Sequence, residues 1–165
     1  MIIINKRNLF FLISVWLLST LLSAQNVTIS TPHTQLLLSV PNGGTPEQLY
    51  YGSRTSDADI RSICETARRR KAYPVYGMGY PCETALSVRH ADGNLTLQMA
   101  VIGVKETRLT KENATLTVIE LKDKVYPFFV NICYKAWQDA DVIETWTEIR
   151  HEEKKPVQLQ QFASA

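Results

Sequence analysis

The clearest pattern along the chain is an alternation of apolar and polar residues, which is typical of β-strands with one buried face. In residues 126–136, one face of the expected strand is wholly apolar and consists of Tyr126, Phe128, Val130, Ile132, Tyr134 and Ala136. The opposite face carries Asn131, Cys133 and Lys135, with Phe129 as an apolar exception. This alternation predicts a long strand that packs one side against a core.

A second alternating stretch indicates a hairpin. Leu86 and Val88 alternate with smaller or polar residues, and residues 90–94, His-Ala-Asp-Gly-Asn, supply the glycine and Asx chemistry of a turn. The alternation resumes over 95–101, so we expect these two segments to pair with each other. Further strands are predicted over residues 27–31, 35–40, 47–52, 114–122, 142–150 and 156–163, with turns at 111–113 and 122–124.

Residues 56–68 break this β pattern. The apolar positions Ile60, Ile63, Cys64 and Ala67 recur at helical spacing, and Ser56 or the next residue can accept the free N–H groups of a first turn. We therefore predict a short helix whose apolar stripe packs inward. Many short strands with one short helix predict an all-β fold, an antiparallel β-sandwich in a single domain.

The N-terminus has the parts of a secretory signal peptide. Lys6 and Arg7 precede the apolar run Leu9–Leu22, and Ala24 is a small residue before a polar one. The run is shorter than the roughly 20 residues that cross a bilayer, so a permanent membrane span is the weaker alternative. We expect residues 1–24 to be removed, the mature domain to comprise residues 25–165, and the protein to be secreted or periplasmic.

The formal net charge of +2 comes from this leader. Lys6 and Arg7 are lost with it and no acid is lost, so the mature chain has as many acidic as basic residues. A neutral domain gives no reason to expect nucleic acid or anionic lipid as a partner. The one basic cluster, Arg68–Lys71, is interpreted as the solvated end of the short helix, where cations favour the helix dipole.

Cysteines and histidines indicate neither a disulfide framework nor a metal site. Cys64, Cys82 and Cys133 are too few for a framework, at most one bridge can form, and its pairing stays open. The three histidines lie far apart in the sequence with no cysteine at ligand spacing. We therefore expect no metal and no other cofactor.

Four local pairs of acidic residues are candidates for catalysis, because glycosidases commonly use two carboxylates about 5–9.5 Å apart. The local pairs are Asp57 and Asp59, Asp139 and Asp141, Glu144 and Glu148, and Glu152 and Glu153. The first two pairs lie in turn-like stretches and are expected to serve capping and solvation. Glu144 and Glu148 flank Trp146 on one strand face, which fits either a sugar platform or an ordinary sheet face. There is no nucleophile elbow or glycine-rich phosphate loop, so the residues alone identify no catalytic constellation.

The segment 73–83, Tyr-Pro-Val-Tyr-Gly-Met-Gly-Tyr-Pro-Cys-Glu, concentrates tyrosines, prolines and glycines. Gly77 and Gly79 permit positive φ, and Tyr76 and Tyr80 can stack on a pyranose ring. An ordinary packed Ω-loop has the same composition, so both interpretations stand.

Three stretches together carry a resemblance: QLYYGSRTSDAD, YPVYGMGYPCETALSVRHADGN, and the C-terminal LKDKVYPFFVNICYKAWQDADVIETWTEIRHEEKKPVQLQQFASA. In this order they resemble the N-terminal domain of family 36 glycoside hydrolases, the large bacterial α-galactosidases. The resemblance extends roughly from Val27 to Ala165. It implies a β-supersandwich that precedes a catalytic (β/α)8 barrel.

The resemblance also implies that this chain is not catalytic by itself. The nucleophile and general acid of this retaining family are aspartates of the barrel, which would follow Ala165. Residues 135–139, Lys-Ala-Trp-Gln-Asp, do not match the family's nucleophile motif. The chain therefore resembles a truncated α-galactosidase with a sandwich incomplete at its C-terminal end, whether as a fragment, an interrupted reading frame or a designed expression product.

In the family, loops of the N-terminal domain lie near the sugar pocket of the barrel, some across a subunit interface. The resemblance therefore makes Tyr76, Tyr80 and Glu83 candidate substrate-proximal residues, although the family often has a charged residue near the position of Tyr80. The expected function is accessory to α-galactoside hydrolysis, with α-galactosides as ligands only when a barrel is present. The alternatives are a stand-alone carbohydrate-binding sandwich and a homo-oligomer assembly module.

We predict that the exported protein begins at Gln25, because the leader ends in the small residue Ala24. Mass spectrometry of the N-terminal peptide from the cell exterior or periplasm checks this. Recovery of an intact Met1 in the membrane fraction would identify an anchor instead.

Overall fold

The computed structural model describes residues 25–163, and the expected leader, residues 1–24, lies outside this range. The first sheet contains β1 (Gln25–Ser30), β2 (Thr34–Val40), β3 (Glu47–Ser53) and β4 (Arg70–Lys71) in that order. The second contains β6 (Met99–Leu109), β7 (Ala114–Asp123), β8 (Phe128–Trp137) and β9 (Val142–His151), while β5 (Leu86–Arg89) pairs with β10 (Gln158–Phe162). The helix α2 (Asp57–Thr66) and the 3₁₀ turn η1 (Thr110–Glu112) complete the described elements. The predicted all-β antiparallel sandwich with one short helix is confirmed.

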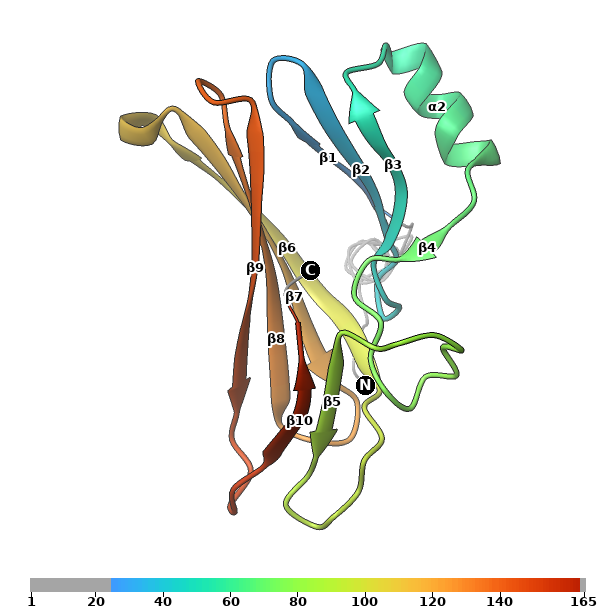
Figure 1. The fold of residues 1–165 in the computed structure, drawn as a ribbon, viewed down its shortest axis with the longest axis vertical. Helices are drawn as coiled ribbons and strands as arrows, with labels where there is room; N and C mark the ends of the chain where they lie inside the picture. The colour runs from blue at the N-terminus through green and yellow to red at the C-terminus, as the bar shows by residue number, and fades with distance from the viewer. Residues whose placement is uncertain (1–24, 164–165) are drawn as a thin grey trace, which may run out of the picture.

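The core lies between the β6–β9 sheet on one side and the β1–β4 sheet and the β5–β10 pair on the other (Figure 1). The alternation predicted for β8 is confirmed, since Phe128, Val130 and Ile132 are fully buried. The same core cluster includes Met99, Ile119 and Leu121 from the β6–β9 sheet, and Val27, Ile29, Leu36, Leu38, Leu86, Val88 and Leu97 from the rest of the domain. Removing such side chains from water stabilises the fold by about 1.5–3 kcal/mol each before entropy is counted. Tyr126 lies just before the strand, because the Asp123 carboxylate accepts its backbone N–H at 2.8 Å and turns the chain.

The predicted pairing of 86–89 with 95–101 is wrong. Residues 90–94 do form a turn, closed by the His90 N–H donating to the Asn94 carbonyl at 2.8 Å. Beyond it, the N–H of Leu97 donates to the Tyr76 carbonyl at 3.1 Å, and that of Gln98 to the Asp123 carboxylate at 2.5 Å. These acceptors hold 95–98 away from β5, which pairs with β10 instead, while β6 begins at Met99 and pairs with β7.

The helix begins as predicted and packs more loosely than predicted. Ser56 is its N-cap, and Ser56 and Asp59 form a reciprocal capping box. None of its residues is buried: Ile60 and Ile63 are half-exposed, because the helix lies at the margin of the sheet beside β3 (Figure 1). The expectation of an apolar stripe packed into the core is therefore wrong.

The basic cluster does not end the helix, which corrects the interpretation of Arg68–Lys71. Residues 70 and 71 form the edge strand β4, in which Lys71 pairs with Glu47 and Arg70 with Gln48. The Glu47 carboxylate binds Lys71 Nζ at 2.8 Å and Arg69 at 3.4 Å. The last two cations of the cluster therefore lie on the edge of a sheet.

No helix within residues 25–163 is long and apolar enough to cross a membrane. The cysteines Cys64, Cys82 and Cys133 are all free thiols there. Cys82 is exposed, whereas Cys133 is buried on β8 opposite Trp146 of β9. Burial, with a smaller contribution from the negative charge of Glu148, raises the pKa of the Cys133 thiol to about 11.

We predict that Cys82 reacts first with a thiol reagent at pH 8 and that Cys133 reacts only after unfolding. Cys133 is only 2% exposed and, with its pKa at about 11, remains protonated at this pH. Counting thiols with a chromogenic disulfide before and after guanidinium addition checks this. The Cys82→Ser variant should lose the fast phase, and a fast phase that survives this change would contradict the assignment.

Candidate functional site

The loop 73–83 is anchored in the core at its start. Tyr73 and Val75 are buried, and Val75 forms a parallel bridge with Leu86 at the beginning of β5. The Tyr76 N–H donates to the Leu86 carbonyl at 2.9 Å, and the Tyr73 hydroxyl donates to the carbonyl of Ala163 at 3.3 Å. Burial raises the pKa of the Tyr73 hydroxyl. The first half of the loop is therefore a rigid support.

Two glycines turn the second half of the loop outward. Gly77 has φ of 97°, and a Cβ there would lie 2.7 Å from Thr96 Cγ2, so no other residue fits. Gly79 has φ of 70° with open space around it. As a result Tyr76 and Tyr80 are 48% and 36% exposed.

The structure places the three sequence-predicted residues on one loop without forming one pocket from them. Tyr80 lines a hollow together with the basic residues 68–71, and Tyr76 does not line it. Glu83 is exposed and accepts from Gln161 Nε2 at 2.9 Å, which ties the end of the loop to β10. A contact of these residues with sugar stays a prediction.

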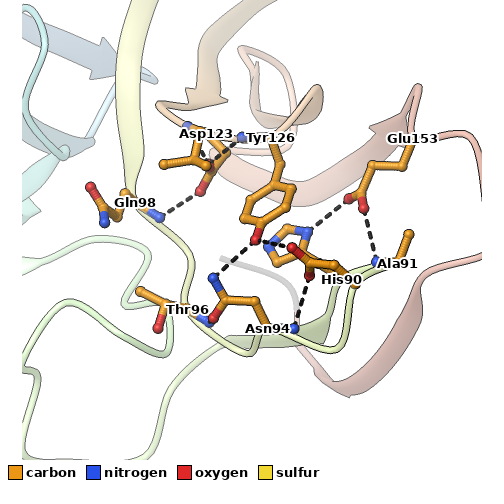
Figure 2. A network of polar contacts seen from close by, with 10 residues as sticks. His90, Ala91, Asn94, Thr96, Gln98, Asp123, Tyr126 and Glu153 are labelled. Carbon is orange, nitrogen blue, oxygen red and sulfur yellow. Dashed lines mark hydrogen bonds and ion pairs between the residues drawn. The ribbon is translucent and has the colours of Figure 1, made fainter.

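A buried polar network, which the sequence analysis missed, holds the other end of β5 (Figure 2). Its centre is His90, whose side chain is 0% exposed and whose Nδ1 lies 2.7 Å from a carboxylate oxygen of Glu153. The second oxygen of Glu153 accepts from the Ala91 N–H at 2.9 Å. His90 Nε2 is buried without a hydrogen-bond partner, and the ring stacks on Tyr126 with centroids 3.7 Å apart. Because no face of the imidazole reaches solvent, His90 is a structural residue.

The stacked Tyr126 extends this network to the turn. Its hydroxyl donates to Asp92 at 2.7 Å and accepts from Asn94 Nδ2 at 3.0 Å (Figure 2). The Asn94 backbone N–H and the Tyr126 hydroxyl stabilise the Asp92 carboxylate and lower its pKa. The only sequence signal was the run His-Ala-Asp-Gly-Asn, which predicts a turn but gives no partner for its side chains.

Within residues 25–163, every candidate carboxylate except Asp57 has a structural partner. The Asp59 carboxylate accepts from the backbone N–H and the hydroxyl of Ser56, the N-cap of α2. The other contacts are Asp139 with Asn113, Asp141 with Thr31 and the His33 N–H, Glu144 with Trp137, Glu148 with Asn131 and Trp146, Glu152 with Arg150, and Glu153 with His90. The Thr31 hydroxyl and the His33 N–H also lower the pKa of Asp141. Within the part of the chain that the structure describes, no group of three His, Cys, Asp or Glu residues can hold a metal ion.

Comparison with known proteins gives a family and a fold. The model of the glycosyl hydrolase family 36 N-terminal domain matches residues 44–165. No curated protein matches the chain in sequence. The α-galactosidase from Lactobacillus brevis has a similar fold, with a TM-score of 0.73 and 16% identity over 86% of this chain and 23% of that chain.

Two further solved structures agree. The family 36 α-galactosidase AgaA from Geobacillus stearothermophilus, bound to 1-deoxygalactonojirimycin, has a TM-score of 0.74 and 14% identity over 85% of this chain and 24% of its own. The galactosidase domain of the α-galactosidase–sucrose kinase AgaSK has a TM-score of 0.68 and 22% identity over 84% of this chain and 24% of its own. The chain therefore spans about a quarter of the length of the solved structures it matches.

We predict that Glu153→Ala lowers the free energy of unfolding by roughly 2–4 kcal/mol. Two buried donors, at His90 and Ala91, then lose their acceptor at about 1–3 kcal/mol each. Glu153→Gln keeps one acceptor and should be intermediate. Urea unfolding followed by circular dichroism measures the three proteins, with exposed Glu152→Ala as a control expected to cost under about 1 kcal/mol. Equal losses at positions 152 and 153 would contradict a central role for the buried pair.

Proposed function

The chain belongs to the glycosyl hydrolase family 36 N-terminal domains, and from this we propose that it is the accessory β-sandwich of an exported α-galactosidase-like hydrolase. The observation that carries the proposal is the family match over residues 44–165 on a sandwich of the same fold as α-galactosidases. The domain would support α-galactoside hydrolysis while contributing no catalytic group.

The engaged carboxylates support a non-catalytic role. A glycosidase needs one carboxyl group free to donate a proton and a second free to attack or to activate water. Glu153 is buried against His90, and the Asp141 carboxylate accepts from Thr31 and His33. The Glu144 and Glu148 carboxylates flank Trp146 as the sequence pattern indicated, and both accept from indole N–H groups. The resemblance to the family implies that the catalytic aspartates belong to the barrel and not to the sandwich.

The loop 73–83 is the surface by which the domain would meet a sugar. Its base is fixed by Tyr73 and Val75, while the rings of Tyr76 and Tyr80 are exposed. A rigid base lowers the entropy lost when exposed aromatic rings bind a ligand. Sugar sites also need several convergent polar groups, so these rings would form one wall of a site that a catalytic domain completes.

We predict that the purified chain does not hydrolyse an aryl α-galactoside. A family 36 enzyme assayed in parallel gives the positive control. Turnover by this chain that is abolished by a substitution within residues 25–165 would overturn the proposal.

Transcript sequencing beyond codon 165 gives a second check that does not depend on activity. A continuation that codes for a (β/α)8 barrel, in frame or shifted, would support the accessory role. An unrelated gene after a genuine stop codon, together with micromolar galactose binding by the chain, would identify an autonomous binding module instead.

A further inference from the structure

A hollow of about 500 Å³ lies between the basic cluster and the tip of the aromatic loop. One side is formed by residues 68–71, Arg-Arg-Arg-Lys, and the other by Tyr80, Pro81 and Cys82. The volume lies within the roughly 300–1,000 Å³ typical of small-molecule sites. No carboxylate lines the hollow.

The cations around this hollow are only partly neutralised. Glu47 pairs with Lys71 and Arg69, and these bonds lower the pKa of its carboxyl group. Arg69 also donates to Ser39, and Lys71 to Thr45. Arg68 and Arg70 are exposed, and within residues 25–163 their side chains form no hydrogen bond or ion pair. Two guanidinium groups are therefore free to bind an oxyanion, which they recognise through paired N–H donors.

The side of the hollow opposite the basic cluster is suited to bind a sugar ring. Tyr80 and Pro81 are exposed on the outward half of the loop and present flat apolar surfaces. Tyrosine rings stack on the apolar face of a pyranose while their hydroxyl groups stay available for hydrogen bonds. A ligand that satisfies both walls carries an anionic substituent on a sugar ring.

We propose that this hollow binds an anionic saccharide, a galactoside that carries a sulfate or a carboxylate group. Arg68 and Arg70 bind the anionic group, and Tyr80 stacks on the ring. The choice of a sugar rests on the proposed function, whereas the requirement for a negative charge rests on the cations alone. Residues 25–165 contain equal numbers of acidic and basic residues, and the basic cluster is only four residues long. A nucleic-acid strand follows a long basic groove, which so short a cluster does not provide.

Calorimetric titration of the whole chain with four probes tests the proposal. The probes are galactose, galactose 6-sulfate, galacturonic acid and inorganic sulfate, each at low and high salt. We expect galactose 6-sulfate or galacturonic acid to bind at least about tenfold more tightly than galactose or sulfate, and to weaken as salt rises. The two acidic sugars distinguish a sulfate from a carboxylate ligand.

Two sets of variants locate the binding. Arg68→Ala with Arg70→Ala should weaken the acidic sugar by at least about tenfold, since charge-assisted bonds are lost. Arg54→Ala with Arg61→Ala removes the same charge from exposed residues outside the hollow and should leave binding unchanged. Tyr80→Ala should weaken the acidic sugar and leave inorganic sulfate unaffected. Circular dichroism confirms that each variant is folded.

The outcomes separate this inference from the proposed function. Equal affinity for galactose and its acidic derivatives would overturn the anionic site and leave the α-galactosidase assignment in place. Equal affinity for galactose 6-sulfate and inorganic sulfate would overturn the choice of a sugar as the ligand. No binding of any acidic sugar would also overturn the inference, while a barrel-coding continuation of the transcript would still support the proposed function.

Discussion

The carboxylate of Glu153 is shared between two buried donors, and the placement of β5, β10 and the aromatic loop depends on it. One oxygen lies 2.7 Å from His90 Nδ1 and the other accepts the Ala91 N–H at 2.9 Å. A buried carboxylate costs several kcal/mol unless its oxygens have partners. Because each oxygen has its own partner, the segment after β9 has one favourable position against the turn after β5.

This constraint matters because β5 and β10 form only a two-stranded sheet. A two-stranded ribbon is marginally stable by itself and needs a hydrophobic face or a packed neighbour. Leu86 and Val88 supply that face, since both are 0% exposed and belong to the same core as Phe128. The loop 73–83 is attached to this ribbon through Val75 and Glu83, so it gains rigidity from a strand pair that the His90 network holds at its far end.

The sequence predicted most of the elements, although it missed β4 and placed a strand over 95–98, and it did not predict how the strands pair. Alternation reports which face of a strand is buried, and Phe128, Val130, Leu97 and Met99 are buried as their pattern predicts. It carries no information on the neighbouring strand, so the adjacent segments 86–89 and 95–101 were paired, whereas β5 pairs with a strand about seventy residues later. The helix cap at Ser56 could be predicted because Ser56 and its partner Asp59 lie within one helical turn of each other in the sequence. The loop of the candidate site was found from its composition, but its supporting network was not, because His90 and Glu153 are brought together only by the fold.

The position of the basic cluster, residues 68–71, also could not be predicted from local sequence, and two explanations of its charge can be distinguished. Helical spacing ends at Ala67, and the chain then becomes extended, so Arg70 and Lys71 form the open edge of the first sheet and Arg68 and Arg69 precede it. Charged residues on an edge strand discourage pairing with another chain, and this role accounts for cations anywhere along β4. Protection of the edge does not account for the other side of the hollow, where Gly77 and Gly79 turn Tyr80 outward to face the cations. Edge protection requires charge alone, whereas a hollow with free guanidinium groups on one wall and an aromatic ring on the other has the two features that an acidic sugar requires.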